Sequence, residues 1–351
     1  HKIMHILEPK LKLRVLGQGI GLPEIAPLDN VDILRRHPET RDKPDAFLQV
    51  FAKKIESGFG QGRRRMIRPP GEPGNVDEAT AEDLALAACR ATLARTPGRD
   101  PAAFVLGSTT SARYTGSQAA AVLGKLGKHA PAFEIKAGCS TSQASLLYAY
   151  SLMQLGYPDV LVACAETLSK TVHPDIKETW FGFADGAAAL WLAKDEKNPH
   201  FEVEKACFQS DGEHVDLYTV PGRMPPLREE FDQKRYFISG DSAEMKVHAL
   251  ERYVRMIEAI LPTAEERKSI RCIVPHQVNI RLIEEVVEKT GMKDIPMLWD
   301  SKEHGNIGGA SILFSLAKAF EAGQFKPGDR VLIASVGGGL NFGAQVLRFH
   351  A

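Results

Sequence analysis

Short apolar segments alternate with amphipathic segments along most of this 351-residue chain. The apolar segments are rich in β-branched residues, which is typical of strands, and several of the segments between them repeat their apolar residues with helical spacing. Strands that alternate with helices predict an α/β fold with buried sheets. The predicted strands are 11–17, 102–108, 132–138, 159–165, 187–193, 271–277, 329–335 and 342–349, and the predicted helices are 81–96, 142–156, 279–291 and 310–323.

The charge balance of the chain argues against nucleic acid as a partner. The 44 basic and 44 acidic residues cancel, the pI is near 7.3, and no long run of one charge occurs. No stretch approaches the roughly 18 consecutive apolar residues of a membrane span, and the first residues lack the uninterrupted apolar segment of a signal peptide. We therefore expect a cytoplasmic protein that does not insert into a membrane.

Two pairs of predicted strands resemble each other. The run 159–165 leads through a loop to FADGAAALWL, and 329–335 leads through three glycines to FGAQVLRF. This similarity indicates two duplicated halves, 1–195 and 196–351, although generic buried hairpins would look alike too. Residues 211–245 have little periodicity, which predicts a long loop of the kind that often covers a site.

The cysteine pattern favours neither a disulfide framework nor a zinc site. The five cysteines have wide, irregular spacing and form no CxxC pair, so we expect free thiols and neither metal nor cofactor. Four of them lie in apolar segments, where a cysteine usually acts as a small buried hydrophobe; these are Cys89, Cys164, Cys207 and Cys272.

Cys139 has a different setting. It follows the predicted strand EIKAG and precedes three hydroxyl residues at the start of a predicted helix. At a helix N-terminus, free N–H groups and the helix dipole favour a thiolate, so we expect a pKa below the usual value of about 8.5 and a nucleophile on a sharp turn. An inert buried cysteine is the alternative.

Three further segments place polar or glycine residues near predicted strand ends. His276 follows the run RCIV, and Asn306 stands in HGNIGG before the helix near Ala310. Ligands of α/β proteins gather at such an edge, although a lone histidine more often packs and an asparagine beside glycines more often forms a turn. The glycine run 337–339 suits either an oxyanion hole or a tight hairpin.

Five ordered motifs give the chain its strongest resemblance. FEIKAGCSTSQASLLYA, FADGAAALWL, VPHQVNIRL, HGNIGGASILFSLA and SVGGGLNFGAQVLRF resemble, in this order, the motifs of the β-ketoacyl-acyl-carrier-protein synthase III family. Weaker similarity extends over nearly the whole chain. The resemblance implies a five-layered αβαβα thiolase fold built from two similar halves, and a homodimer.

The resemblance also implies roles for the residues in these motifs. Cys139 matches the nucleophile that accepts the acyl group, and His276 and Asn306 match the pair that binds the thioester carbonyl of the second substrate. Gly338 matches the residue whose N–H joins that of Cys139 in an oxyanion hole. These residue types suit the chemistry, because a thiolate exchanges readily with a thioester and preorganised donors stabilise an oxyanion.

Some positions depart from the better-known members of the family. Ala52 and Glu56 replace a tryptophan and an arginine that clamp coenzyme A, which weakens the expectation of a coenzyme A-bound primer. Lys177 and Arg281 match basic residues at the substrate entrance, although both could be ordinary surface charges. Gly116 replaces a bulky aromatic residue that closes the partner subunit's primer pocket, which implies room for a longer or wider starter.

We therefore expect decarboxylative Claisen condensation of an acyl thioester primer, carried by coenzyme A or acyl carrier protein, with malonyl-acyl carrier protein, in fatty acid or polyketide-type synthesis. A second hypothesis keeps the acyl-cysteine but transfers the acyl group to an oxygen or nitrogen nucleophile. A third makes the chain a non-catalytic partner in a synthase heterodimer. Release of CO2 distinguishes the first hypothesis from the second.

Overall fold

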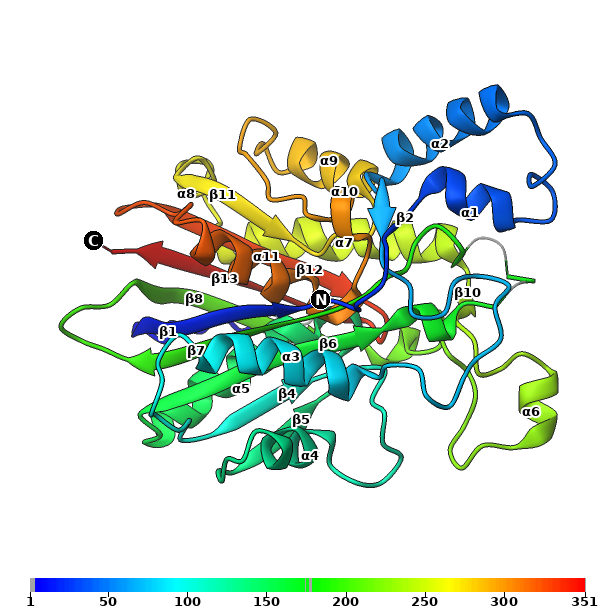
Figure 1. Cartoon of the computed structure of the whole chain (residues 1–351). Helices are drawn as coiled ribbons and strands as arrows, with labels where there is room; N and C mark the ends of the chain where they lie inside the picture. Colours follow the sequence, from blue (N-terminus) through cyan, green and yellow to red (C-terminus); the bar gives the residue numbers. More distant parts are fainter. Residues whose placement is uncertain (1–3, 174, 177–178, 351) are drawn as a thin grey trace.

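A nine-stranded sheet forms the centre of the molecule in the computed structural model, which describes residues 4–173, 175–176 and 179–350 (Figure 1). The strand order is β11-β12-β13-β8-β1-β7-β6-β4-β5. The strands are β1 (Leu11–Gly21), β4 (Phe104–Gly107), β5 (Ala132–Ile135), β6 (Asp159–Thr167), β7 (Asp185–Lys194), β8 (Phe201–Ser210), β11 (Ile270–Pro275), β12 (Arg330–Gly337) and β13 (Asn341–Phe349).

The two halves of the sheet repeat one topology. In the first half, β4 is parallel to β5 and β6, and β6, β7 and β1 follow as antiparallel neighbours. In the second half, β11 is parallel to β12, and β12, β13 and β8 follow as antiparallel neighbours. Antiparallel pairing of β1 with β8 joins the halves into one sheet. The predicted boundary at 195/196 lies between β7 and β8 and stays a prediction.

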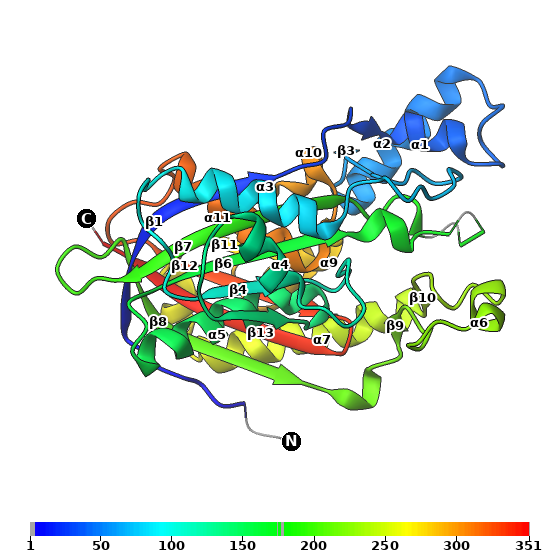
Figure 2. The same cartoon turned by 60° about the horizontal axis from the view of Figure 1, so that its bottom comes forward.

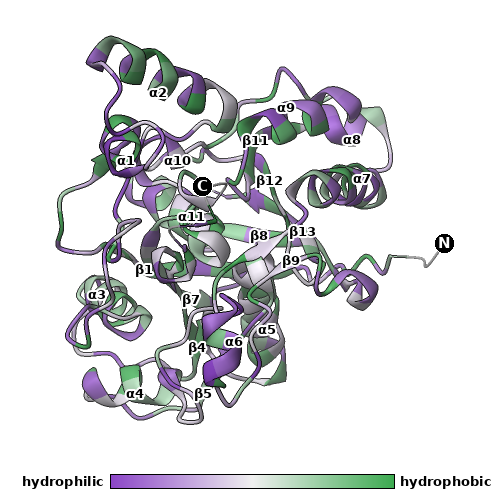
Figure 3. Ribbon diagram, turned by 90° about the vertical axis from the view of Figure 1, so that its right-hand side faces the viewer, coloured by the Kyte–Doolittle hydropathy of each residue, from purple (hydrophilic) through white to green (hydrophobic). Residues whose placement is uncertain are grey.

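Helices form three layers around the two halves of the sheet, as the end-on view shows (Figure 3). One outer layer holds α3 (Ala81–Leu93) and α4 (Gln118–Lys125), the central layer holds α5 (Thr141–Leu155) and α11 (Ser311–Glu321), and the other outer layer holds α7 (Ser242–Ile260) and α9 (Ile280–Lys289). Together with the sheet halves they make five layers, αβαβα. The predicted α/β class and layered fold are confirmed.

Successive side chains of each buried strand point to opposite faces of the sheet, so each strand packs against two different helix layers. Val160, Val162 and Cys164 of β6 pack in the central cluster, whereas Leu161, Ala163 and Ala165 pack against α3 and α4. The same period of two recurs in β12, where Val331 and Ile333 face the central layer and Leu332 and Ala334 face α7 and α9. Because both faces of these strands are buried, their sequences are continuously apolar.

Two excursions extend from the same end of the molecule (Figures 1 and 2). The first holds α1 (Asn30–Arg36) and α2 (Asp45–Phe59), with β2 (Leu28–Asp29) paired to β3 (Arg63–Arg64). The second, residues 211–241 of the predicted loop 211–245, has only short elements: η4 (Gly212–His214), β9 (Tyr218–Thr219), α6 (Arg228–Asp232) and β10 (Ser239–Gly240). The last residues of the predicted loop, from Ser242, instead begin α7. The other short helices among the described residues are η1 (Gly138–Ser140), η2 (Leu168–Thr171), α8 (Ala264–Lys268), α10 (Ser301–His304) and η5 (Gly308–Ala310).

No helix in the described part of the chain combines the length and the apolar character that crossing a membrane requires.

Candidate active site

Cys139 lies in η1, on the short turn between β5 and α5. Gly138 precedes it with φ of 57°, and a Cβ at this position would lie 2.3 Å from the carbonyl oxygen of Gly338, so only glycine fits. Thr141 Oγ1 accepts from the Ala137 N–H at 3.0 Å and donates to the Gly138 carbonyl at 2.7 Å. These bonds fix the turn and place the cysteine at the N-terminal end of α5.

The glycine run 337–339, which starts at the last residue of β12, packs against Cys139. A Cβ on Gly337 would lie 2.4 Å from the Cβ of Cys139, and the backbone N–H of Gly338 hydrogen-bonds the thiol. The run also forms the tight connection between β12 and β13. The sequence leaves two uses of these glycines open, a tight hairpin and a close approach of their backbone to a ligand or reacting group. The structure shows the hairpin together with a close approach to Cys139.

The pKa of Cys139 departs from the sequence-based expectation. Burial, followed by the negative charge of Glu166, raises the pKa of the thiol to about 12, while the N–H of Gly338 lowers it. The expected depression by the helix N-terminus is therefore wrong in direction. Burial and the charge of Glu166 outweigh the hydrogen bond from the Gly338 N–H, so the free enzyme holds a protonated thiol at neutral pH.

His276 follows β11 and is 1% exposed. Its N–H donates to the Ala334 carbonyl at 2.9 Å, and its Nδ1 lies 2.8 Å from Ser311 Oγ. Burial lowers the pKa of the ring to about 4, so the ring is neutral at pH 7. We expect the Ser311 hydroxyl to donate to Nδ1, which places the ring proton on Nε2. Nε2 has no hydrogen-bond partner among the described residues and can donate to a ligand.

Asn306 precedes η5 and is also 1% exposed. Its Oδ1 accepts the N–H of Gly308 at 2.8 Å, which fixes the orientation of the amide because a backbone N–H can only donate. Its backbone carbonyl accepts from the Ala184 N–H at 2.9 Å. The Nδ2 group has no hydrogen-bond partner in the described part of the chain. It is a second buried donor without a partner.

The two halves of the fold meet at these three residues. The turn η1 contacts both η5 and β12. A Cβ on Gly309 would lie 2.7 Å from the Gly138 carbonyl, and Ser142 Oγ donates to the Gly309 carbonyl. Ser311, the partner of His276, begins α11 directly after η5. The structure thus brings together the three distant segments that hold Cys139, His276 and Asn306.

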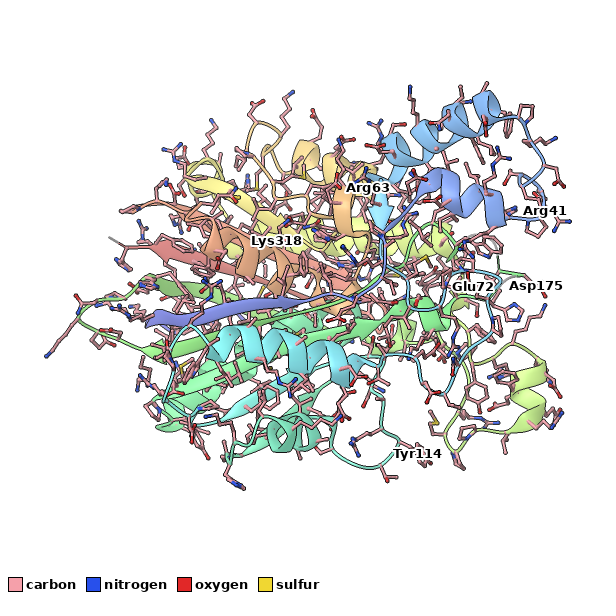
Figure 4. The ribbon with its side chains drawn as sticks, viewed as in Figure 1. Arg41, Arg63, Glu72, Tyr114, Asp175 and Lys318 are labelled. Atoms are coloured by element: carbon pink, nitrogen blue, oxygen red, sulfur yellow. The ribbon has the colours of Figure 1, made fainter. Side chains whose placement is uncertain are left out.

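The other predicted site residues lie away from this centre. Gly116 is exposed on the loop between β4 and α4, and Tyr114 of the same loop is 62% exposed (Figure 4). Arg281 is exposed in the first turn of α9 and pairs with Glu284 at 2.9 Å. Lys177 lies outside the described residues.

The two positions of the expected coenzyme A clamp lie on α2. Ala52 is buried, and its carbonyl accepts from Asn30 Nδ2 at 3.3 Å. Glu56 pairs with Lys302 at 3.6 Å. Neither residue offers an aromatic ring or a cation for binding a nucleotide.

Sequence reasoning missed Ser311 and Glu166. Ser311 orients His276, and nothing in its local sequence separates it from the other serines of the chain. Glu166 left a signal, because it is a single carboxylate at the end of the apolar run DVLVACAE. A buried charge is costly, so such a residue usually has a specific role.

Comparisons with known proteins point to one family. The family model described as 3-oxoacyl-[acyl-carrier-protein (ACP)] synthase III matches residues 133–212, and the model of the C-terminal part of that family matches residues 263–349. The β-ketoacyl-[acyl-carrier-protein] synthase III of Clostridium perfringens (strain 13 / Type A) is 30% identical over 312 residues, 86% of this chain and 92% of the relative. The protein of the same name from Ruegeria sp. (strain TM1040) is 32% identical over 314 residues, 87% of this chain and 93% of the relative.

A solved structure extends the agreement to the fold. The crystal structure of 3-oxoacyl-(acyl carrier protein) synthase III from Pseudomonas aeruginosa PAO1 has a TM-score of 0.80 and 26% identity, and covers 97% of this chain and 99% of that chain. Fold, motifs and overall length therefore all correspond. This chain belongs to the β-ketoacyl-[acyl-carrier-protein] synthase III family.

Proposed function

We propose that this chain catalyses decarboxylative Claisen condensation of an acyl thioester primer with malonyl-acyl carrier protein, through an acyl-Cys139 intermediate. One observation carries the proposal: the Gly338 N–H is directed at the Cys139 thiol, and the segments packed against this turn hold two buried nitrogens without hydrogen-bond partners among the described residues, His276 Nε2 and Asn306 Nδ2. A thiol accepts an acyl group, and paired donors stabilise an enolate.

In the first half-reaction, Cys139 attacks the carbonyl carbon of the primer thioester. The backbone N–H groups of Cys139 and Gly338 hold the oxyanion of the tetrahedral intermediate. The bond between the carbonyl carbon and the carrier sulfur then breaks, and the acyl group stays bound to Cys139 as a thioester. The thiol proton of Cys139 leaves with the carrier, which departs as a free thiol.

In the second half-reaction, a malonyl thioester binds with its thioester carbonyl between His276 Nε2 and Asn306 Nδ2. The bond to the carboxylate breaks, CO2 leaves, and the electron pair forms an enolate that the two donors stabilise. The enolate carbon attacks acyl-Cys139, the new carbon–carbon bond forms, and the cysteine sulfur leaves. The released Cys139 thiolate takes a proton from water, which the high pKa of the thiol favours, and the free enzyme is restored.

Release of CO2 tests this function against acyl transfer to an oxygen or nitrogen nucleophile. We expect one CO2 for each acyl-Cys139 that malonyl-acyl carrier protein discharges. Discharge to an alcohol or amine without CO2 would support the alternative. A protein that forms no acyl adduct with any primer would instead be the non-catalytic partner of a synthase heterodimer.

The partners follow from the same proposal. Acyl carrier protein delivers the malonyl group, coenzyme A or a carrier protein delivers the primer, and two copies of the chain form a homodimer in the cytoplasm. Family membership supports these assignments. The edge strand β5 ends the sheet and offers unpaired backbone groups to a second copy.

Arg281→Glu should raise KM for malonyl-acyl carrier protein by up to about tenfold with little change in kcat, because an exposed entrance charge acts mainly on encounter with an acidic partner. Steady-state kinetics at two salt concentrations measure this, and the difference should shrink at high salt. Arg271→Glu is the control and should leave KM unchanged. Arg271 is exposed and lies near the start of β11, whereas His276 follows the end of that strand. Equal effects of both changes would contradict the prediction.

The primer should be longer or wider than acetyl. Ala52 and Glu56 offer no clamp for coenzyme A, and the nearest atom to a Cβ on Gly116 would be Arg113 Cδ at 3.6 Å, so a larger residue fits there without strain. A chain-length series of acyl-coenzyme A and acyl-carrier-protein donors measures the preference. Medium-length or branched donors should react best, and Gly116→Phe should restore preference for short chains. Acetyl-coenzyme A outcompeting every longer donor on the unmodified protein would contradict this.

A further inference from the structure

Gln277 directly follows His276 and is equally buried, with 1% of its surface exposed. Its Oε1 accepts the Ser301 N–H at 2.7 Å, and its Nε2 donates to the Leu298 carbonyl at 3.2 Å and to Ser315 Oγ at 2.8 Å. A backbone N–H only donates and a backbone carbonyl only accepts, so these partners fix the orientation of the amide. Both ends of a buried polar group are thus paired, as such a group requires.

The bonds of Gln277 lead to the segment that holds Asn306. The Ser301 hydroxyl lies within hydrogen-bond distance of two carbonyl oxygens, that of Gln277 at 3.0 Å and that of Gly305 at 2.8 Å. The Gly305 N–H donates in turn to the Ser301 carbonyl at 2.9 Å. Gly305 directly precedes Asn306. A single residue, Ser301, therefore connects the neighbour of His276 with the neighbour of Asn306.

The helix α11 holds the same part of the chain from a second side. Ser311 and Ser315 are four residues apart on α11, so they lie one turn apart on one face of the helix. Ser311 Oγ lies 2.8 Å from Nδ1 of His276, and Ser315 Oγ accepts from Nε2 of Gln277. Two successive residues after β11 are thus fixed to one rigid helix.

An ion pair completes this network. Ser315 Oγ donates to Asp300 Oδ2 at 2.6 Å, and Lys318 Nζ donates to Asp300 Oδ1 at the same distance (Lys318 is labelled in Figure 4). Because the Ser315 proton is directed to a carboxylate, its oxygen remains free to accept from Gln277. Asp300 directly precedes Ser301, so the network closes on itself.

The proposed second half-reaction requires such a frame. Two donors that bind one carbonyl oxygen must each lie about 3 Å from it, so the spacing between His276 Nε2 and Asn306 Nδ2 must stay fixed. A displacement of about 1 Å can cost about a hundredfold in rate. Local bonds alone cannot set this spacing, because the two residues come from separate segments.

We propose, building on the function proposed above, that Gln277 is a positioning residue of the second half-reaction: its amide, together with Ser301 and Ser315, sets the spacing of His276 and Asn306. Gln277 itself has no contact with the reacting atoms. The turn of Cys139 is held by a different set of bonds, those of Thr141. Loss of the Gln277 amide should therefore slow the steps that follow acylation and spare acylation itself.

Two variants of Gln277 test this with the two half-reactions measured separately. Gln277→Leu removes all the side-chain bonds, whereas Gln277→Glu keeps the size and the oxygen that accepts from Ser301 but replaces Nε2 with an oxygen. Rapid quench measures formation of acyl-Cys139, and CO2 release measures its discharge by malonyl-acyl carrier protein. Both variants should form acyl-Cys139 at the rate of the unmodified protein and discharge it about ten- to a hundredfold more slowly, in kcat rather than in KM.

Ser301→Ala tests the connection to Asn306 and serves if the Gln277 variants do not fold. It keeps the backbone N–H that Gln277 accepts but removes the hydroxyl that reaches Gly305, so discharge should slow by less than in Gln277→Leu. Gln345→Leu is the matched control for loss of a buried amide. Gln345 is also 1% exposed, and its Oε1 accepts from the Tyr150 hydroxyl at 2.9 Å. This control should lower the thermal midpoint without changing the ratio of the two rates.

The outcomes separate this inference from the proposed function. If the folded variants of Gln277 and Ser301 discharge acyl-Cys139 at the unmodified rate while His276→Ala and Asn306→Ala do not, the inference is wrong and the function stands. Equal slowing of acylation and discharge, or a ratio changed as much by Gln345→Leu, means general disturbance and also overturns it. If His276→Ala and Asn306→Ala discharge normally too, the two donors and the inference both fall.

Discussion

Cys139→Ala should abolish both acyl-enzyme formation and condensation while the protein stays folded. The change removes the nucleophile, so the covalent route is lost and turnover should fall by about 10⁴ or more. The change removes only one sulfur atom from a half-buried turn. The hydrogen bonds of Thr141 with Ala137 and Gly138 still hold this turn in place. Intact-mass spectrometry after exposure to acyl thioesters measures the first effect, and thermal unfolding measures the second.

Cys164→Ala is the control for this change. Cys164 is fully buried in β6, and its thiol lies 3.8 Å from Ser145 Oγ. It therefore represents the four cysteines that we expect to be inert. Its loss should leave acylation in place at a modest cost in stability. Acylation that persists in Cys139→Ala, or a variant that fails to fold, would give Cys139 a structural role instead.

His276→Ala and Asn306→Ala should each slow decarboxylation and condensation by about 10²–10³, the usual effect of losing one preorganised donor to an oxyanion. Acylation of Cys139 should be less affected, because the two donors act in the second half-reaction. Rapid-quench measurement of acyl-Cys139 formation, beside steady-state release of CO2, separates the two steps. Normal condensation by both variants would show that this set of residues is wrong.

Asn306→Asp gives the sharper version of this test. An aspartate keeps the oxygen that accepts the Gly308 N–H, so the local turn is retained, but it replaces the Nδ2 donor with an acceptor. If Asn306 acts as a donor, Asn306→Asp should be at least as slow as Asn306→Ala. Activity close to that of the unmodified protein would mean that Asn306 serves the turn alone.

Much of the fold follows from local sequence. All eight predicted strands and all four predicted helices occur with ends shifted by a few residues. The strand β8 and the helix α7 were missed for physical reasons. In FEVEKACFQS, charged residues interrupt the apolar pattern of β8, and α7 carries many charged residues beside its buried positions Ala249, Tyr253 and Met256. Tertiary packing decides both elements.

The site is less predictable than the fold. The motifs placed Cys139, His276 and Asn306 near strand and helix ends, and the structure brings their segments together. The Ser311 bond to His276 and the charge of Glu166 near Cys139 join residues far apart in the chain, so no local pattern reports them. The direction of the Cys139 pKa was wrong for the same reason: the helix end is visible in the sequence, but burial and a neighbouring carboxylate are not.

The central claim is that acyl-Cys139 is the intermediate that a malonyl thioester discharges with loss of CO2. The most direct measurement loads the protein with a medium-length acyl thioester, removes free donor, adds malonyl-acyl carrier protein, and follows the mass of the protein, the modified peptide and CO2 together. The account predicts one acyl group, located on Cys139, that disappears as an equal amount of CO2 and β-ketoacyl-carrier protein forms. An acyl group on another residue, or its loss without CO2, would contradict the account.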